Sequence, residues 1–327
     1  MATQRLGLHK QKSIELIDSF DRVTFDRHVA SCLSDTDIFT AISGCGLLSG
    51  RTAKVLGAKY VCDRGSTHIQ HQLNVLRDEH AEWGMPFTPT HERIVERELN
   101  EYREADLITV PSDYSKRTFI EHGIDESKVK SIRYGADINQ FYPNEYREER
   151  ELIVAYIGGI NIRKGIQYLF QAFSKIAARN KKLWLIGQAD EAFVDRLRNL
   201  SMIPREAVFF GHVIQSELRD RLSQARVLVL PSIEDGFGLV VAQALACGCP
   251  AIVTDCSGSA ELIENGKNGY VVPARNVEAL TDAINQVVES KSYMLMRHSA
   301  RSKVEDIGGW SQYGDIVTST YESLLNA

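Results

Sequence analysis

The sequence predicts an α/β protein with two doubly wound domains, each a parallel sheet between layers of helices. Short runs rich in aliphatic and β-branched residues alternate with longer segments of helical periodicity. Most of the short runs are continuously apolar, which is typical of strands buried on both faces of a parallel sheet. A length of 327 residues suits two such domains.

The expected strands form two groups along the chain. In the first half they are residues 37–43, 59–63, 106–112 and 129–135. In the second half they are residues 152–158, 182–187, 207–211, 226–232, 250–255 and 270–273. Because strands and helices alternate in both halves, each half favours a sheet of its own.

Amphipathic helices are expected between these strands. After Gly165, apolar side chains recur at three- and four-residue spacing and predict one buried helix face; they are Ile166, Leu169, Phe170, Phe173 and Ile176. Residues 91–106 repeat this pattern beneath a charged outer face. The last segment opens on the pair Gly308–Gly309 and has helical periodicity from Trp310 to Leu324.

The division between the domains is expected in the polar segment 139–152, which carries Pro143 and has no apolar periodicity. The predicted domains are residues 1–145 and 146–308. A final helix, residues 309–327, is expected to cross back to the first domain.

The composition excludes several classes of protein. A net charge of −5 gives no basic excess for nucleic acid, and no run of eighteen apolar residues predicts a membrane-spanning helix. The first residues lack the apolar core of a signal peptide. Six cysteines in a chain of this length do not form a disulfide framework, and we interpret Cys247 and Cys249 as reduced thiols in a packed turn. These features favour a cytoplasmic protein.

The stretch PSIEDGFGLVVAQALACGCP, residues 231–250, predicts an anion site. An expected strand ends, a turn with two glycines follows, and an apolar helix begins. Free backbone N–H groups at a helix start attract anions, and glycine allows a ligand to approach closely. The donors expected at this turn belong to Gly236, Phe237, Gly238 and Leu239. The amide of Gln243 in the apolar helix needs a partner, which is either a backbone group of a neighbouring loop or a ligand hydroxyl.

Residues 231–272 closely resemble the donor-site signature of the group 1 (family 4) retaining glycosyltransferases, which have the GT-B fold. That fold consists of two Rossmann-like domains facing a cleft, here with a first domain that looks shortened at its start. In the family an acid contacts the transferred sugar, and a Glu eight positions later binds the ribose hydroxyls. The matching residues are Asp235, with Glu234 beside it, and Gln243, which has no charge.

Other segments match the same family. YIGGINIRKG, residues 156–165, resembles its phosphate-binding segment, which implies that Arg163 and Lys164 face the donor diphosphate; Gly159 stands where an additional Arg is common. The loops that enclose the base are matched by Gly187, Gly211 and Val213. The alternative for Arg163 and Lys164 is a solvated helix start.

The resemblance is weaker in the first ninety residues. Asp63 and His68 follow an expected parallel strand, and ligands bind beyond the carboxyl ends of such strands. The resemblance implies that His68 touches the donor sugar and that Asp63 acts as an acceptor-side base; a structural role is the alternative for both. Tyr134 replaces the usual Asn before Gly135. No strand–glycine–helix opening precedes residue 37, although such an opening is usual in the family.

The resemblance therefore implies a retaining glycosyltransferase of the hexosyltransferase type, for instance in polysaccharide biosynthesis. Its donor is a UDP- or GDP-linked sugar, its acceptor is a hydroxyl of a glycan, lipid or small molecule, and it needs no metal or other cofactor. Peripheral contact with the inner membrane is left open. The alternatives are a nucleotide-sugar epimerase, a sugar-phosphate synthase and a noncatalytic sugar-nucleotide-binding protein.

Overall fold

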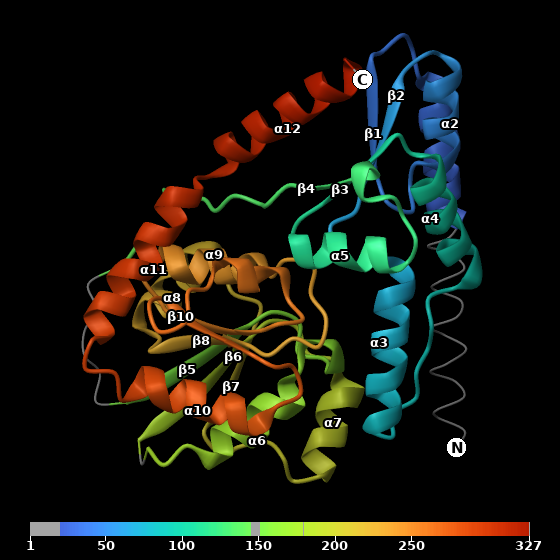
Figure 1. The fold of residues 1–327 in the computed structure, drawn as a ribbon. Helices are drawn as coiled ribbons and strands as arrows, with labels where there is room; N and C mark the ends of the chain where they lie inside the picture. The colour runs from blue at the N-terminus through green and yellow to red at the C-terminus, as the bar shows by residue number, and fades with distance from the viewer. Residues whose placement is uncertain (1–19, 145–150, 179, 327) are drawn as a thin grey trace. The chain divides into compact units, whose positions relative to one another are not determined.

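The computed structural model describes residues 20–144, 151–178 and 180–326 (Figure 1). The chain divides into two compact units: unit 1 contains Met1–Arg133 and Asp315–Ala327, and unit 2 contains Tyr134–Gly314. The units therefore divide earlier than the predicted boundary near residue 145. The segment 145–150 beside that boundary lies outside the described residues.

Unit 1 holds, in its described part, a parallel sheet in the order β1-β2-β3-β4. Its strands are β1 (Ile38–Ile42), β2 (Lys59–Asp63), β3 (Leu107–Val110) and β4 (Val129–Ser131). Its helices are the helix at residues 20–32, α2 (Leu47–Val55), α3 (Ile69–Glu82), α4 (Glu92–Glu104), α5 (Asp113–Glu121), the short η1 (Glu126–Lys128) and the last part of α12 (Trp310–Leu325).

The two faces of the unit 1 sheet are covered differently. Alternate side chains of a strand point to opposite faces. On one face Tyr60, Cys62 and Ile108 join the hydrophobic core that includes residues of α3, α4 and α5. On the other face, Thr40 Oγ1 of β1 lies 2.9 Å from the hydroxyl of Tyr321 in α12. The strand order of this sheet follows the chain order without reversal.

Unit 2 contains a parallel sheet in the order β10-β9-β8-β5-β6-β7. Its strands are β5 (Leu152–Ile157), β6 (Lys181–Ile186), β7 (Ala207–Gly211), β8 (Val227–Leu230), β9 (Ala251–Thr254) and β10 (Gly269–Val272). Its helices are η2 (Ile162–Lys164), α6 (Ile166–Lys175), α7 (Glu191–Asn199), α8 (Gln215–Gln224), α9 (Leu239–Ala246), η3 (Gly258–Leu262), α10 (Val277–Val288), α11 (Tyr293–Ile307) and the start of α12.

Helices cover both faces of the unit 2 sheet, with α8, α9 and α11 on one side and α6, α7 and α10 on the other (Figure 1). The strands between them are buried runs, as the continuous apolar sequence predicted; Val154, Leu183 and Val227 have no exposed surface. Each of the ten predicted runs contains a strand, and all the strand pairs within the described residues are parallel.

The strand order of unit 2 reverses at one place. The chain runs from β5 outward to β7 and then returns to the other side of β5, where β8 begins a second outward run. The carboxyl ends of β5 and β8 therefore flank a topological switch point, where ligands bind in open α/β sheets. The order in unit 1 creates no such point within the described strands.

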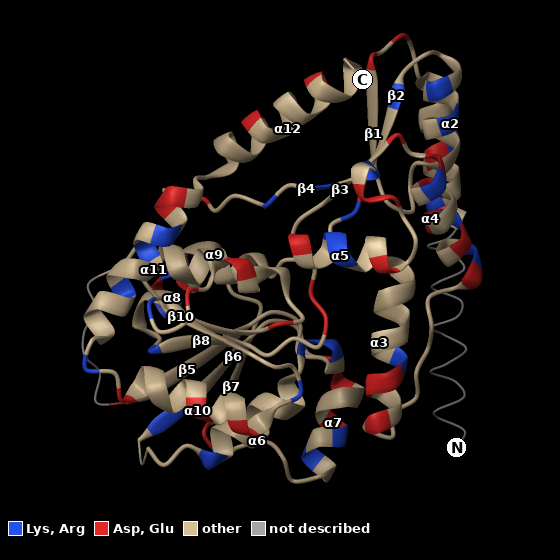
Figure 2. Ribbon diagram, viewed as in Figure 1, with Lys and Arg blue, Asp and Glu red and all other residues tan. Residues whose placement is uncertain are grey.

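Figure 2 shows Lys and Arg interspersed with Asp and Glu along helices such as α4 and α7. Among the described residues, no helix combines the length and the apolar character that crossing a membrane would require.

Candidate functional site at the switch point of unit 2

Two loops meet at the switch point of unit 2. One follows β5 and contains η2, and the other follows β8 and leads to α9. The backbone N–H of Ile233 donates to the carbonyl of Arg163 at 2.9 Å, which joins the loops directly. Gly165 has a φ of +69°, and a Cβ there would lie 1.9 Å from the carbonyl oxygen of Pro231. Only glycine allows this approach, so the sequence Arg163–Lys164–Gly165 is fixed against the end of β8.

The two cations of the first loop face the two acids of the second. Arg163 Nε lies 2.7 Å from Glu234 Oε2, and Lys164 Nζ lies 2.5 Å from Asp235 Oδ2. The Glu234 side chain is fully buried, whereas 31% of the Arg163 side chain is exposed. A carboxylate so buried is stable only with a cation or several donors beside it. The pairing brings together the predicted residues Arg163, Lys164 and Asp235.

Asp235 is also held by its backbone. Its N–H donates to the carbonyl of Cys256 at 3.0 Å, and its carbonyl accepts from the N–H of Gly258 at 3.0 Å. The loop after β9 therefore joins the loops after β5 and β8. Ser232 Oγ lies 3.5 Å from the Asp235 carboxylate. Three strand ends thus fix the orientation of this acid.

The start of α9 lacks a cap from its own side chains. Its N-cap residue is Gly238, with a φ of +70°, and its first turn carries no acidic residue. A Cβ at Gly238 would lie 2.7 Å from Leu230 Cδ2, so the turn packs closely on the end of β8. Phe237 anchors the turn between the two glycines, with only 2% of its surface exposed. The helix start keeps the partial positive charge that attracts an anion.

Tyr156 of β5 holds the loop after β5 in position. Its hydroxyl donates to the carbonyl of Gly159 at 2.6 Å, and the side chain is fully buried. Burial raises the pKa of this phenol well above its usual value, and the charge of Asp235 adds to the effect. The Tyr156 hydroxyl is therefore a fixed donor at ordinary pH.

The residues predicted for the base lie on the same edge of the sheet. Gly187 follows β6, and its N–H donates to the carbonyl of Gly211, the last residue of β7, at 2.8 Å. A Cβ at Gly187 would lie 2.0 Å from the carbonyl oxygen of Gly158, so this glycine lets the ends of β5 and β6 touch. Val213 follows two residues after β7 and is half-buried.

Gln243 lies in the second turn of α9 and is half-buried. No hydrogen bond of its side-chain amide to another described residue is found, in contrast to the buried Gln167, which donates to the carbonyl of Ile162 at 3.2 Å. The sequence alone allowed either a loop partner or a ligand for Gln243, and in the structure its amide is available to a ligand.

Asp63 and His68 lie in unit 1. Asp63 ends β2 and accepts a hydrogen bond from Thr109 Oγ1 at 2.7 Å, while burial raises its pKa. His68 is buried and caps α3, because its Nδ1 accepts from the N–H of Gln70 at 3.2 Å. Burial, with the charges of His122 and Arg64, lowers the His68 pKa to about 3. The ring is therefore neutral at ordinary pH, and its Nε2 is the nitrogen that carries the proton.

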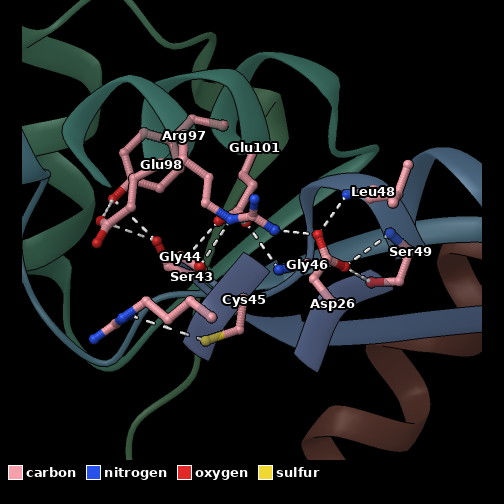
Figure 3. Close-up of polar contacts among 12 residues, drawn as sticks. Asp26, Ser43, Gly44, Cys45, Gly46, Leu48, Ser49, Arg97, Glu98 and Glu101 are labelled. Atoms are coloured by element: carbon pink, nitrogen blue, oxygen red, sulfur yellow. Dashed lines mark hydrogen bonds and ion pairs between the residues drawn. The ribbon is translucent and has the colours of Figure 1, made fainter. Parts of the chain in front are cut away.

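A strand–glycine–helix element is present in unit 1, at β1, Ser43–Gly46 and α2 (Figure 3). Its backbone donors are bound by carboxylates of the chain. Glu101 accepts from the N–H groups of Gly44 at 2.5 Å and Gly46 at 2.9 Å. Sequence reasoning did not identify this element; the signal that could have found it is the pair of glycines after the strand expected at residues 37–43.

The start of α2 is capped from another helix. Asp26, in the helix at residues 20–32, accepts from the N–H groups of Leu48 at 2.7 Å and Ser49 at 2.9 Å, and it pairs with Arg97. Burial raises the Glu101 pKa to about 7. The starts of α2 and α9 thus differ, because the first already has two carboxylates of the chain as partners.

A pocket of about 470 Å³ lies next to this element. It is lined by Phe20, Val23, Arg27, Leu47, Arg93, Glu96, Arg97 and Asn100. Leu47 follows the carboxyl end of β1, so the pocket belongs to the edge of the sheet where ligands bind. No ion pair of Arg27 or Arg93 with another described residue is found. Sequence reasoning did not identify this pocket, because helices distant in sequence form it.

The two cysteines predicted in a packed turn are part of the core. Cys247 and Cys249 are buried free thiols, and burial raises the pKa of each to about 12. Within residues 20–144, 151–178 and 180–326, no group of three or more His, Cys, Asp or Glu side chains is placed to hold a metal ion.

Comparison with known proteins gives a family match, several relatives and a fold for this chain. The family model for glycosyl transferases group 1 matches residues 151–290, which contain both loops of the switch point. An uncharacterized glycosyltransferase of Methanocaldococcus jannaschii is 26% identical over 244 residues, which cover 69% of this chain and 62% of that relative. The D-inositol 3-phosphate glycosyltransferase of Corynebacterium jeikeium is 26% identical over 281 residues, which cover 79% of this chain and 66% of that relative. The chain therefore spans less than two thirds of the length of each.

Among solved structures, Anabaena HepE in complex with UDP and glucose is similar, with a TM-score of 0.72 and 19% identity; the match covers 91% of this chain and 81% of that one. At this identity the likeness concerns the fold. The predicted α/β class, with the parallel Rossmann-like sheets of GT-B proteins, is confirmed.

Proposed function

The chain belongs, through residues 151–290, to the group 1 glycosyltransferases, and on this premise we propose that it transfers a sugar from a nucleoside diphosphate sugar to a hydroxyl group. The observation that carries this proposal is the meeting of Arg163, Lys164 and the start of α9, whose N-cap residue Gly238 has no capping side chain, at the switch point of unit 2. Two cations and a helix start form a site for a diphosphate.

The ion pairs of the structure are compatible with a bound diphosphate. An ammonium has three N–H donors and a guanidinium has five, so Lys164 and Arg163 can each bind phosphate oxygens while they remain paired with Asp235 and Glu234. Charge-assisted hydrogen bonds contribute about 1.5–3 kcal/mol each. At the upper end of this range, two such bonds and the helix start together approach about 8 kcal/mol, the scale of micromolar binding.

The proposed donor is a UDP-linked sugar, with a GDP-linked sugar as the alternative. Anabaena HepE, which shares the fold, was solved with UDP and glucose. In this chain the available amide of Gln243 is proposed to bond the ribose hydroxyls. Gly187 and Gly211 are proposed to enclose the base through backbone groups at the neighbouring strand ends.

In the proposed reaction the bond between the anomeric carbon and the phosphate oxygen breaks, and the acceptor oxygen takes its place with retention of configuration. The charge that develops on the diphosphate is stabilised by Arg163, Lys164 and the amides at the start of α9, and such electrostatic stabilisation is usually the largest contribution to catalysis. Asp235 is proposed to contact the transferred sugar. The proton of the acceptor hydroxyl leaves with the phosphate or through Asp63.

His68 is proposed as a hydrogen-bond donor to the sugar. A ring whose pKa is about 3 is a poor proton acceptor, whereas the N–H on its Nε2 can donate. No metal is proposed in this reaction. Activity is therefore expected to persist after dialysis against EDTA, and loss of activity that Mg²⁺ restores would contradict that part of the proposal.

The acceptor is proposed to carry an anionic group. The pocket of unit 1 has Arg27 and Arg93 in its lining, without an ion pair to another described residue. The name of the Corynebacterium jeikeium relative contains D-inositol 3-phosphate, a compound with an anionic phosphate group. Replacing both arginines with Gln should raise the KM for an anionic acceptor without raising the KM for the donor.

The experiment that tests the function pairs calorimetric titration with a transfer assay. UDP and GDP and their glucose and N-acetylglucosamine derivatives are titrated, and products are then analysed with a panel of hydroxyl acceptors. Free nucleoside diphosphate plus a glycoside supports the proposal. An isomerised donor indicates an epimerase, and binding without turnover indicates a noncatalytic sugar-nucleotide-binding protein.

A further inference from the structure

Phe237, the residue between the two glycines of the turn Gly236–Gly238, packs against other aromatic side chains at the end of unit 2. Its ring centroid lies 5.5 Å from that of Tyr134, in an edge-on arrangement. Tyr134 in turn lies 6.0 Å from Trp310 and 5.8 Å from Tyr313, between ring centroids. These four side chains are called the aromatic cluster below.

The cluster lies where the chain enters and leaves unit 2. Unit 2 begins at Tyr134 and ends at Gly314. At this place the two backbones touch, because a Cβ on Gly135 would lie 2.3 Å from the carbonyl carbon of Gly309. A Cβ on Gly309 would lie 3.2 Å from the carbonyl oxygen of Ala136. Glycine at 135 is therefore required by the approach of the second segment.

A second contact ties the same segment to the other end of α9. Arg301 of α11 donates from Nη1 to the carbonyls of Phe141 and Ala246, at 3.0 Å each. Ala246 is the last residue of α9, and the turn before α9 contains Phe237. The aromatic contact between Phe237 and Tyr134 thus joins the start of α9 to the segment 134–141. The guanidinium of Arg301 joins the end of α9 to the same segment.

A turn with glycine on both sides of one residue has little stiffness of its own. Its position depends on the packing of Gly238 against the end of β8 and on how firmly the middle side chain is held; Phe237 is only 2% exposed. Its aromatic contact with Tyr134 restrains it from the side of the chain entry. Loss of that contact should therefore loosen the turn without removing any group that touches the ligand.

We infer that Tyr134 is a positioning residue: it holds the donor turn Gly236–Gly238 through Phe237 and connects occupancy of that turn to Trp310, where the chain leaves unit 2. The part of this inference that concerns nucleotide rests on the proposed function, whereas the ordering of the turn does not. The chain has Tyr at this position where the family it resembles usually has Asn, so the contact is a property of this sequence.

The first test uses the protein without nucleotide. Hydrogen exchange is compared at residues 236–240 in the wild type, Tyr134→Ala and Tyr134→Phe. Faster exchange in Tyr134→Ala, with wild-type exchange in Tyr134→Phe, is expected because Phe keeps the ring. The control is Tyr142→Ala, which removes an aromatic side chain from the same part of the chain, where it packs on Arg219. Equal exchange in the wild type and Tyr134→Ala would overturn the inference, whether or not nucleotide binds.

The second test uses the tryptophan signal. UDP should change the fluorescence excited at 295 nm. The change should be smaller than in the wild type in Trp310→Phe and Tyr134→Ala and should be kept in Tyr134→Phe; the remainder comes from Trp184, which packs on Phe210 next to Gly211. The affinity for UDP should fall about 2- to 10-fold in Tyr134→Ala, the range expected for one aromatic contact. An unaltered Kd in Tyr134→Ala, or a fluorescence change as large in Trp310→Phe as in the wild type, would overturn the connection to Trp310. If the wild type binds neither UDP nor GDP, the proposed function fails, and the exchange experiment still decides whether Tyr134 orders the turn.

Discussion

The ammonium of Lys164 lies 2.5 Å from the carboxylate of Asp235, so a cation from the loop after β5 meets an acid from the loop after β8. Both side chains are mostly buried, with 17% and 10% of their surfaces exposed. The pair lies at the switch point, where the sheet topology already favours a ligand. Its two members are expected to have separable roles, because one attracts the diphosphate and the other repels it.

Replacing Lys164 with Ala should weaken UDP binding by about 1.5–3 kcal/mol, because one charge-assisted hydrogen bond to the diphosphate is lost. Calorimetric titration measures this directly, as an increase in Kd of about 10- to 150-fold. The matched control is Lys175→Ala, since Lys175 is half-exposed in α6 and pairs with the surface residue Glu278. Equal affinities in the Lys164 variant and the wild type would place the phosphates elsewhere.

Replacing Asp235 with Asn should separate binding from catalysis. The change removes a negative charge from the vicinity of the diphosphate and releases Lys164 to bind it, so the Kd for UDP should stay the same or fall. The rate of sugar transfer should decrease about 10-fold or more, because a charged contact to the transferred sugar is lost. Weaker UDP binding together with an unchanged turnover rate would contradict both assignments.

The sequence predicted unit 2 more completely than unit 1, because the site residues of unit 2 lie in short continuous stretches of the chain. Two short stretches contain most of the site residues of unit 2: the cations at 163–164, and the glycines at 236 and 238 with the helix at 239–246. The spacing within each stretch therefore predicts the site. The partner of Arg163 could not be derived, because Glu234 is placed beside it only when β5 and β8 become neighbours.

In unit 1 the important contacts join distant segments. Asp26 caps α2 across more than twenty residues, and Glu101 binds the glycine turn across more than fifty. Single-sequence patterns contain no signal for such pairs. The glycines in the letters SGCG at 43–46 are a signal for the turn itself, but sequence reasoning did not use it. For the same reason the pocket lined by Arg27 and Arg93 became apparent only from the structure.

Replacing Gln243 with Leu should remove discrimination between UDP and 2′-deoxy-UDP. In the wild type the amide is expected to favour UDP by about 0.5–1.5 kcal/mol, the net value of one neutral hydrogen bond. Gln243→Glu should increase that preference, since hydrogen bonds to charged groups are stronger. If Gln243→Leu retains the wild-type ratio of the two Kd values, the ribose does not lie beside α9.

Gly165 and Gly211 provide a matched test of close approach. Both have positive φ, +69° and +66°, but a Cβ at Gly165 would meet Pro231 whereas nothing lies within 4 Å of one at Gly211. Alanine at either site costs about 1–2 kcal/mol for the left-handed backbone. Only Gly165→Ala adds a collision with a carbonyl, so its melting temperature should be clearly lower and its UDP binding should be lost. Equal melting temperatures would show that the two loops do not touch at the switch point.

His68 should make unit 1 less stable in acid. Its pKa is about 3 in the folded chain and about 6.5 in an unfolded one, so between these values the unfolded chain binds the additional proton. The stabilising contribution of His68 is present above pH 6.5 and is lost as the pH falls through this window. At pH 5 the loss is about 2 kcal/mol.

The test compares urea unfolding of the full chain at pH 7.5 and pH 5 with hydrogen exchange in α3. His68→Asn keeps a capping side chain and should be less stable at both values, but its difference between the two should be smaller than that of the wild type by about 2 kcal/mol. The control is His91→Asn, because His91 caps α4 in the same manner, at 3.2 Å from the N–H of Arg93, but is not fully buried. An unchanged pH dependence in His68→Asn would mean that His68 has the same pKa in the folded and the unfolded chain, so burial would not depress the pKa of this ring.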